Sequence, residues 1–420
     1  MNINISIDNL WVIFGGILVF WMQAGFAMVE TGFTRSKNAG NVIMKNLMNF
    51  TLGSLIFWII GFGIMFGSDI GGVIGMPKLF GAVDGSAYPK GISSYTFLFF
   101  ETIFCTTAST IVSGAMAERA KFISYCICSV AIGAIIYPVA GHWIWGNGWL
   151  FKLGFHDFAG ATVVYSIGGW CALIGAAMLG PRIGKYSKHG KSTAIPGHSL
   201  TLGALGVFIL WMGWFGFNAA SSMSITGEGL LEITSRIFIT TNLSAAASTM
   251  TTMISTWIKY GKPEVSLTLN GVLAGLVAIT AGCDVVTPKG AVIIGIIAGI
   301  VMVYGIEFID KVLKIDDPVG VIGVYCINGG LGTVLTGLFA AYGNSLGVFY
   351  GGGFNLLIIQ LIGVIAVGIW SVVAATILFR VIKAIVGLRV TRKEEIRGLD
   401  IEEHGLESSY ADFQSIDLNM

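Results

Sequence analysis

Eight polar side chains interrupt the long apolar runs of this sequence and are the first candidates for chemistry: Glu30, Lys45, Glu101, Asp157, Tyr165, Asn218, Ser221 and Tyr325. Polar groups inside apolar helices are costly to bury, so each of them is a functional candidate by default. The spacing of Asp, Glu, His and Cys fits no metal site, and neither a nucleophile–base pair nor a glycine-rich phosphate loop is visible. We therefore expect no enzyme, no bound metal and no cofactor.

Asp157 stands at the start of one apolar run, directly before Phe158, Ala159 and Gly160. A carboxylate at this position can accept hydrogen bonds from the free N–H groups of the first helical turn. We regard a helix cap as its first role. A functional role in shaping the mouth of a binding site is compatible with that cap.

Aromatic residues form a second pattern near the ends of the apolar runs: Phe100, Phe104, Trp143, Trp145, Trp211, Trp214, Phe215 and Phe217. An aromatic belt at the membrane interface is the commoner explanation of such tryptophans. A vestibule for a small cation is the alternative, since a ring face within about 6 Å attracts a cation by about 0.5–2 kcal/mol. From the residues alone, both interpretations stay open.

The elements that must position these side chains are membrane-spanning helices. The chain has 420 residues, of which 55% are hydrophobic and 11% are charged, against about 25% charged in soluble domains. A disordered chain and an ordinary soluble enzyme are excluded, and a net charge of +1 indicates no nucleic-acid partner. At about 20 residues per span there is room for about eleven helices. The apolar runs lie at 10–34, 42–67, 94–117, 123–143, 158–180, 199–218, 234–258, 265–283, 290–309, 321–342 and 354–383.

The basic residues predict the orientation of an all-α polytopic membrane protein. Most of the 24 Lys and Arg residues lie in loops that follow odd-numbered spans or in the C-terminal tail. Cytoplasmic loops carry the excess of positive charge, so the N-terminus is expected outside and the C-terminus in the cytoplasm. The other side holds only Lys78, Lys90, Lys152, Arg236 and Lys289.

Two segments of the chain resemble each other at an offset of 160 residues. Residues 157–169 and 317–329 agree at six of thirteen positions, including Asp157 with Asp317 and Tyr165 with Tyr325. Five spans separate them, and an odd number of spans inverts the second copy, which is typical of a transporter with two inverted halves. Chance agreement between glycine-rich helices is the alternative. The matching Gly169 and Gly329 indicate close helix packing.

Seven motifs follow one another along nearly the whole chain: Gly32–Asn38, Gly114–Arg119, Trp145–Gly148, Asp157–Val164, Gly213–Ala219, Asp316–Pro318 and Gly398–Gly405. Together and in this order they resemble the ammonium transporter (Amt/Mep/Rh) family. The resemblance implies an eleven-helix membrane domain with an inverted five-plus-five repeat and one extra helix, a homotrimer with one pore per subunit, and a place in the plasma membrane.

The resemblance also implies roles for individual residues. Asp157 matches the buried acid of the family, and Trp214 matches a Trp that lines the pore. Phe104 and Phe217 match two stacked rings that gate the pore. The outer ammonium site corresponds to Phe100, Phe104, Trp145 and Ser221.

Two positions depart from the family pattern. Tyr165 and Tyr325 stand where the family usually carries a His pair at the centre of the pore. Imidazole can relay a proton because its pKa is near 6.5, whereas phenol, with a pKa near 10, is a poor acceptor at neutral pH. Gly320 stands where many relatives carry an acid, so Asp317 is expected to be only a loose equivalent of Asp157.

Three functions stay open on these residues. The first is transport of ammonia or ammonium through each subunit. The second is an ammonium sensor or weakly conducting relative, because the proton-relaying His pair is missing. The third is a channel for another small solute that hydrogen-bonds to tyrosine.

The chain is expected to divide into a membrane domain over residues 1–387 and a cytoplasmic regulatory tail over residues 388–420. The mixture of acidic and basic residues in this tail is also compatible with a solvated segment. The family resemblance favours an ordered tail that links subunits and docks a P-II type signalling protein.

Overall fold

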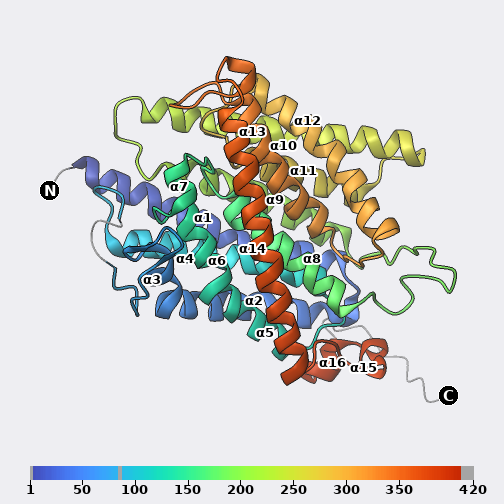
Figure 1. Ribbon diagram of the computed structural model, residues 1–420. Helices are drawn as coiled ribbons and strands as arrows, with labels where there is room; N and C mark the ends of the chain where they lie inside the picture. Colours follow the sequence, from blue (N-terminus) through green and yellow to red (C-terminus); the bar gives the residue numbers. More distant parts are fainter. Residues whose placement is uncertain (1–2, 84–87, 408–420) are drawn as a thin grey trace, which may run out of the picture.

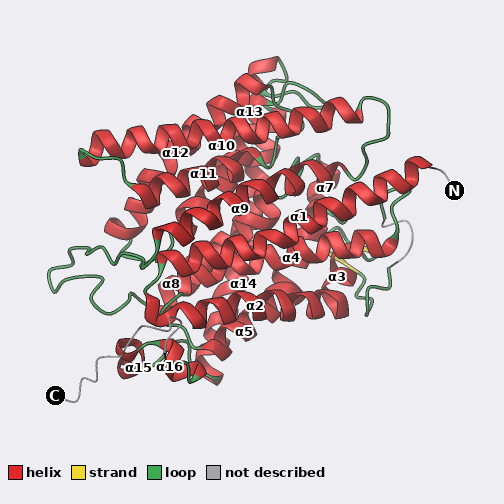
Figure 2. Cartoon of the chain, turned by 180° about the vertical axis from the view of Figure 1, so that it is seen from behind, coloured by secondary structure: helices red, strands yellow, loops and turns green. Residues whose placement is uncertain are grey.

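The protein is a bundle of long helices (Figure 1). The computed structural model describes residues 3–83 and 88–407. Its one sheet within those residues is a small antiparallel hairpin of β1 (Asp69–Ile70) and β2 (Ile74–Gly75). The start of the first long helix and the short helices of the tail lie at opposite ends of the bundle (Figures 1 and 2).

The first half of the chain forms five helical segments, several of them containing a π-helical turn. Their elements are α1 (Ile3–Phe33), η1 (Ser36–Asn38), α2 (Ala39–Ile56), η2 (Phe57–Gly61), α3 (Phe62–Phe66), α4 (Ser94–Met116), α5 (Phe122–Ala131), η4 (Ile132–Ile136), α6 (Tyr137–Ile144), α7 (Trp149–Leu153), η5 (Ala161–Ser166) and α8 (Ile167–Leu179).

The second half forms six more segments, followed by two short helices in the tail. Their elements are α9 (Leu200–Ala219), η6 (Ala220–Ser222), α10 (Leu230–Tyr260), α11 (Val265–Ile279), α12 (Pro288–Glu307), η7 (Phe308–Val312), η8 (Ile322–Ile327), α13 (Asn328–Phe339), η9 (Val348–Tyr350), α14 (Asn355–Ile385), α15 (Arg392–Arg397) and α16 (Leu399–His404).

Nine helices of the described residues are long and apolar enough to cross a membrane, so the fold is an all-α polytopic membrane fold. Two further helices coincide with predicted spans. The apolar helix α11 has only 15 residues, and α10 has 31 residues but many hydroxyl side chains. Thr240 and Ser244 of α10 donate hydrogen bonds to the carbonyl oxygens of Cys283 and Gly275. The hydroxyl side chains make α10 less apolar than its neighbours. Hydrogen bonds to neighbouring segments satisfy those of Thr240 and Ser244 inside the bundle.

The two repeat segments pack against each other through their matching glycines. Gly169 of α8 lies so close to the backbone of Cys326 in η8 that a Cβ atom there would clash. At Gly329 of α13, a Cβ atom would lie 2.5 Å from the carbonyl oxygen of Ala161 in η5. Close helix packing, as predicted from the sequence, is therefore the role of both glycines.

The tail folds back onto the end of the bundle where α2 begins (Figure 2). Asp400 of α16 accepts hydrogen bonds from the N–H groups of Gly40 and Asn41, at 3.0 and 2.8 Å. The carboxylate of Glu395 in α15 accepts from the N–H of Ile183 at 2.7 Å. Helices α15 and α16 of the tail thus contact the membrane domain. The rest of the predicted tail, residues 408–420, lies outside the described residues.

Candidate substrate site and pore

A cavity of about 310 Å³ lies at the end of the bundle where α4 begins and α9 ends. We call it the aromatic cavity. The four residues that the family resemblance assigns to an outer ammonium site all line it. Its lining comprises Phe66, Tyr88, Pro89, Phe97, Phe100, Glu101, Phe104, Ile144, Trp145, Asn147, Phe151, Phe158, Ser221 and Met223.

Helix α4 supplies one wall of the cavity. Phe100 and Phe104 are one helical turn apart, and their ring centroids lie 4.5 Å apart. Trp145 follows the last turn of α6 and meets Phe104 edge to face, with centroids 6.1 Å apart. Its indole N–H donates a 2.8 Å hydrogen bond to the carbonyl oxygen of Asp157. This bond fixes the ring of Trp145 beside the cavity.

Ser221 lies in η6, immediately after α9. Its hydroxyl donates a 2.8 Å hydrogen bond to the carbonyl oxygen of Phe217. The proton is therefore committed, and the oxygen keeps lone pairs that can accept from a donor in the cavity. The site thus offers ring faces and one hydroxyl acceptor, which suits a small cation that carries N–H groups.

Phe104 forms the floor of the aromatic cavity and stacks on a second ring. Phe104 and Phe217 lie face to face with centroids 4.0 Å apart and planes 17° from parallel. Both are almost completely buried. The two rings that the sequence predicts as a gate are therefore in direct contact, with no space between their faces for a solute.

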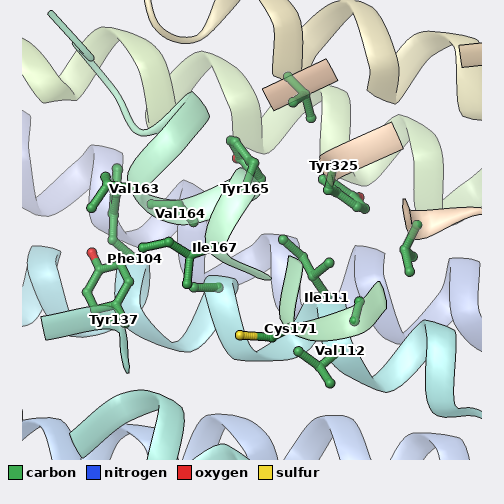
Figure 3. Packing of buried hydrophobic residues seen from close by; sticks show 14 of the residues in the cluster. Phe104, Ile111, Val112, Tyr137, Val163, Val164, Tyr165, Ile167, Cys171 and Tyr325 are labelled. Atoms are coloured by element: carbon green, nitrogen blue, oxygen red, sulfur yellow. The ribbon is translucent and has the colours of Figure 1, made fainter. Parts of the chain in front are cut away.

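Below the floor, the ring of Tyr165 continues the stack. It lies 5.1 Å from Phe217, 4.7 Å from Trp214 and 5.7 Å from Tyr325, measured between ring centroids. Figure 3 shows Tyr165 and Tyr325 side by side in the buried core. The indole N–H of Trp214 donates to the hydroxyl of Thr280 at 2.9 Å. The central residues predicted from the sequence thus form one continuous column of buried rings.

Beyond Tyr325 lies a much smaller cavity of about 20 Å³, lined in part by Phe26, Thr110, Asn270 and Tyr325. This space is about enough for one water molecule. We call it the inner cavity. The column of rings separates it from the aromatic cavity.

Asp157 is a helix cap, as predicted. Its two carboxylate oxygens accept hydrogen bonds from four consecutive N–H groups, those of residues 160–163, at 2.8–3.0 Å. Burial raises the pKa of Asp157, and these four donors oppose the rise. The carboxylate thereby fixes the start of η5, the turn that carries Tyr165.

Asp317 plays the matching role in the second half, which corrects the expectation of a loose equivalence. It accepts hydrogen bonds from the N–H groups of Gly320 and Ile322, at 3.0 and 2.7 Å. Gly160 and Gly320 both adopt positive φ angles, 107° and 85°, which glycine adopts without strain. Gly320 thus adopts the same kind of turn as Gly160, and Asp317 caps it with two backbone hydrogen bonds.

Other polar residues of the candidate set have structural partners away from the aromatic cavity. Glu30 accepts hydrogen bonds from Asn46 and Ser113, at 2.8 and 2.5 Å. Lys45 donates to the carbonyl oxygen of Ala120, and Asn218 donates to the hydroxyl of Thr241. These contacts join helices rather than form a binding site.

Glu101 is one of the polar candidates from the sequence, but it was not assigned to the outer site. Glu101 lines the aromatic cavity with Phe97, Phe100 and Phe104. Positions i, i+3, i+4 and i+7 share one helix face, so the spacing contained the signal. Across residues 3–83 and 88–407, no three side chains of His, Cys, Asp or Glu come together as a metal site.

Comparison with known proteins identifies the family. A profile described as the Ammonium Transporter Family matches residues 10–410. The chain is 44% identical to ammonium transporter Amt2 of Archaeoglobus fulgidus, over 96% of this chain and 88% of the relative. It is 37% identical to ammonium transporter Amt1 of Haloferax mediterranei, over 97% of this chain and 80% of the relative.

Solved structures show the same fold. A protein described as "Sensor Amt Protein" superposes with a TM-score of 0.90 at 43% identity, over 96% of this chain and 99% of the other. Mep2 of Candida albicans superposes with a TM-score of 0.84 at 27% identity, over 92% and 87% of the two chains. On the match of the profile and of these relatives, the chain belongs to the ammonium transporter family.

Proposed function

We propose that this chain recruits ammonium at the aromatic cavity and passes ammonia or ammonium through a pore in its own subunit. It is a multi-pass protein of the plasma membrane, and ammonium is the substrate of its family. The observation that carries the proposal is the cavity lining, where Phe100, Phe104 and Trp145 offer rings and Ser221 an acceptor oxygen. The ring faces attract ammonium through their electrostatic quadrupoles.

Phe104 and Phe217 act as the gate below this site. Their rings stack at 4.0 Å and leave no path between them. A hydrated ion cannot cross this apolar contact without losing its water, which is costly in a low dielectric. Transient separation of the rings admits a small molecule that has given up its proton or its hydration shell.

Tyr165 and Tyr325 occupy the positions at which the family resemblance places the His pair. We infer that the two phenols, with Trp214 beside them, orient the permeating molecule rather than relay its proton. Each phenol has one oxygen that can donate and accept. The hydroxyl of Tyr165 is buried and has no hydrogen-bond partner among the described residues, which leaves it available to a passing solute.

The proposed topology has eleven spans in two inverted halves of five with one extra helix, and its N-terminus lies outside. The helical segments coincide in position with the eleven predicted spans. Asp157 and Asp317 cap equivalent turns, which supports the repeat. In this orientation the aromatic cavity faces outward and α16 faces the cytoplasm.

The proposed assembly is a homotrimer with one pore per subunit. We propose the same division as the sequence predicts, a membrane domain over residues 1–387 and a regulatory tail over residues 388–420 that docks a P-II type signalling protein. The contacts of Glu395 with Ile183 and of Asp400 with α2 support regulation, since they tie the tail to the membrane helices.

Electrophysiology on liposomes that contain the purified trimer tests the proposal. Pulses of ammonium should give currents or uptake that saturate with concentration, and empty liposomes should give none. A well-reconstituted trimer that gives neither current nor uptake would refute transport.

A second candidate function is ammonium sensing with little flux. Two observations favour it: the closed column from Phe104 to Tyr325, and the likeness to a protein described as "Sensor Amt Protein". The double variant Tyr165→His with Tyr325→His discriminates between the candidates. Sensing predicts a large rise in flux in the variant, whereas transport predicts that the wild type already conducts comparably.

A further inference from the structure

Glu101 is a buried carboxyl group in the wall of the aromatic cavity. The residue is 3% exposed. Its Oε2 atom is buried and has no hydrogen-bond partner among the described residues. A buried carboxyl within a membrane helix is functional by default, and its partner must be identified.

The described residues around Glu101 supply no counter-charge. The ion pairs formed within residues 3–83 and 88–407 do not include it. The described titratable side chains near it include Cys105 on α4, Tyr137 on α6 and Tyr88 in the cavity lining. Thiols and phenols are neutral at physiological pH. A carboxylate placed there without a partner is strongly disfavoured, so its charge requires a cation from the cavity.

The aromatic cavity can supply that cation. Its volume of about 310 Å³ holds a small ion with several water molecules. Glu101 lies on the same face of α4 as Phe100 and Phe104, the rings assigned to ammonium. Ammonium has four N–H donors, so it can donate to a carboxylate and to the Ser221 oxygen while it faces a ring.

We propose that Glu101 is a direct carboxylate ligand of the monovalent cation in the aromatic cavity. The occupied cavity then holds an ion pair, and the empty cavity holds a protonated carboxyl group. The inference rests on the proposed function, because it assumes that ammonium binds in this cavity. The carboxylate adds a charged ligand, so the site binds ammonium more tightly than rings and a hydroxyl alone. When the cation arrives, Glu101 releases its proton to water in the cavity.

Isothermal titration of the purified full-length protein with ammonium chloride tests this inference. Glu101→Gln keeps the size of the side chain but removes its charge, so the affinity for ammonium should fall about tenfold, which corresponds to about 1.4 kcal/mol. Glu101→Asp keeps the charge and should retain most of the affinity. Glu232→Gln is the matched control, since Glu232 is an exposed carboxylate in the first turn of α10, and its affinity should change less than about twofold.

The pH dependence of binding is a second measurement that does not depend on the folding of a variant. The affinity of the wild type should fall as the pH is lowered from about 8 to about 5, because protons then compete for Glu101. The cavity lining contains no histidine that would give the same effect. Glu101→Gln should bind with a flat profile.

The outcomes separate this inference from the proposed function. If the wild type binds ammonium and Glu101→Gln binds it equally well, the role of Glu101 is refuted and the aromatic site stands. A wild-type affinity that does not change with pH would also refute the role of Glu101 and leave the aromatic site in place. If the wild type binds no ammonium, the proposed site fails, and the role of Glu101 fails with it.

Discussion

The rings of Tyr165 and Tyr325 stack with centroids 5.7 Å apart and planes 22° from parallel. Each ring is carried by a π-helical turn, η5 or η8, at corresponding positions of the two halves. Such turns are rare and occur frequently at functional sites. Together with Phe104 and Phe217 the two tyrosines close the route between the two cavities. Any permeating solute must therefore displace a ring.

Tyr165→Phe tests whether the phenol oxygen takes part in permeation. Because the buried hydroxyl has no partner among the described residues, its removal should leave the melting temperature unchanged or raise it. Ammonium uptake should fall about five- to tenfold if the hydroxyl orients the solute, the effect of one lost hydrogen bond. Liposome uptake assays measure this change.

Tyr125→Phe is the control for this substitution. Tyr125 is also fully buried, but its hydroxyl contacts the carbonyl oxygen of Ser109 outside the ring column. This variant should lose about 1 kcal/mol of stability and keep its uptake. Equal uptake by Tyr165→Phe and the wild type would contradict a role for the phenol.

Trp145→Leu tests the ring faces of the aromatic cavity. A cation–π contact contributes about 0.5–2 kcal/mol, so the affinity for ammonium should fall about tenfold. Trp143→Leu is a matched control, since Trp143 lies two residues away, donates to the carbonyl oxygen of Val73 and does not line the cavity. Calorimetric titration should show little change for the control. A similar loss in both variants would indicate a general packing effect instead.

Much of the fold could be predicted from the sequence because long apolar runs leave few alternatives in a membrane. The cap at Asp157 could also be predicted, since its partners are the next few residues of the chain. The count of apolar helices was harder to predict. The hydroxyls of α10 pair with α11 and the loop after it, and that pairing depends on the tertiary structure.

The candidate site was predicted less completely. Its aromatic members came from the resemblance to a family, and the structure places them at one cavity. Glu101 was visible as a buried acid, but its side-chain environment depends on how α4 packs against α1, α2 and α8. The bond from Trp145 to the Asp157 carbonyl joins residues in different elements, and no local rule anticipates it.

A comparison of Asp157→Asn with Asp317→Asn tests the two caps. Asn keeps one acceptor oxygen and presents an NH₂ group to N–H donors, so the cap is weakened. Asp157 accepts four backbone hydrogen bonds and Asp317 accepts two. Asp157→Asn should therefore lose about 3 kcal/mol or more and Asp317→Asn about half as much. Thermal unfolding in detergent measures both, and the reverse order would argue against this account.

The buried ion pair of Asp316 and Arg182 predicts a loss of stability in acid. Burial acts to raise the pKa of Asp316, but hydrogen bonds from Arg182 and the charge of Arg119 outweigh it and hold the pKa at about 2. The ordinary value is about 3.9. The pair therefore stabilises the fold above about pH 4 by about 2–3 kcal/mol, and this contribution disappears as the pH falls towards about 2.

Asp316→Asn isolates this contribution from other acid effects. At neutral pH the variant should melt at a lower temperature than the wild type. The gap between the two melting temperatures should narrow as the pH is lowered from about 4 to about 2, since the unfolded wild type then binds a proton at Asp316 before the folded ion pair does. A gap that stays constant over this range would rule out ionisation of Asp316 as its cause.

Asp400→Ala tests the attachment of the tail. The carboxylate of Asp400 accepts two backbone hydrogen bonds at the start of α2, where the helix dipole also favours a negative charge. Its loss should weaken docking by about 1–3 kcal/mol, so trypsin should cleave after Arg397 several-fold faster. Glu407→Ala removes an exposed acid of the same tail and should leave the rate of cleavage unchanged. Equal rates in Asp400→Ala and the wild type would mean that other contacts, such as that of Glu395 with Ile183, hold the tail in place.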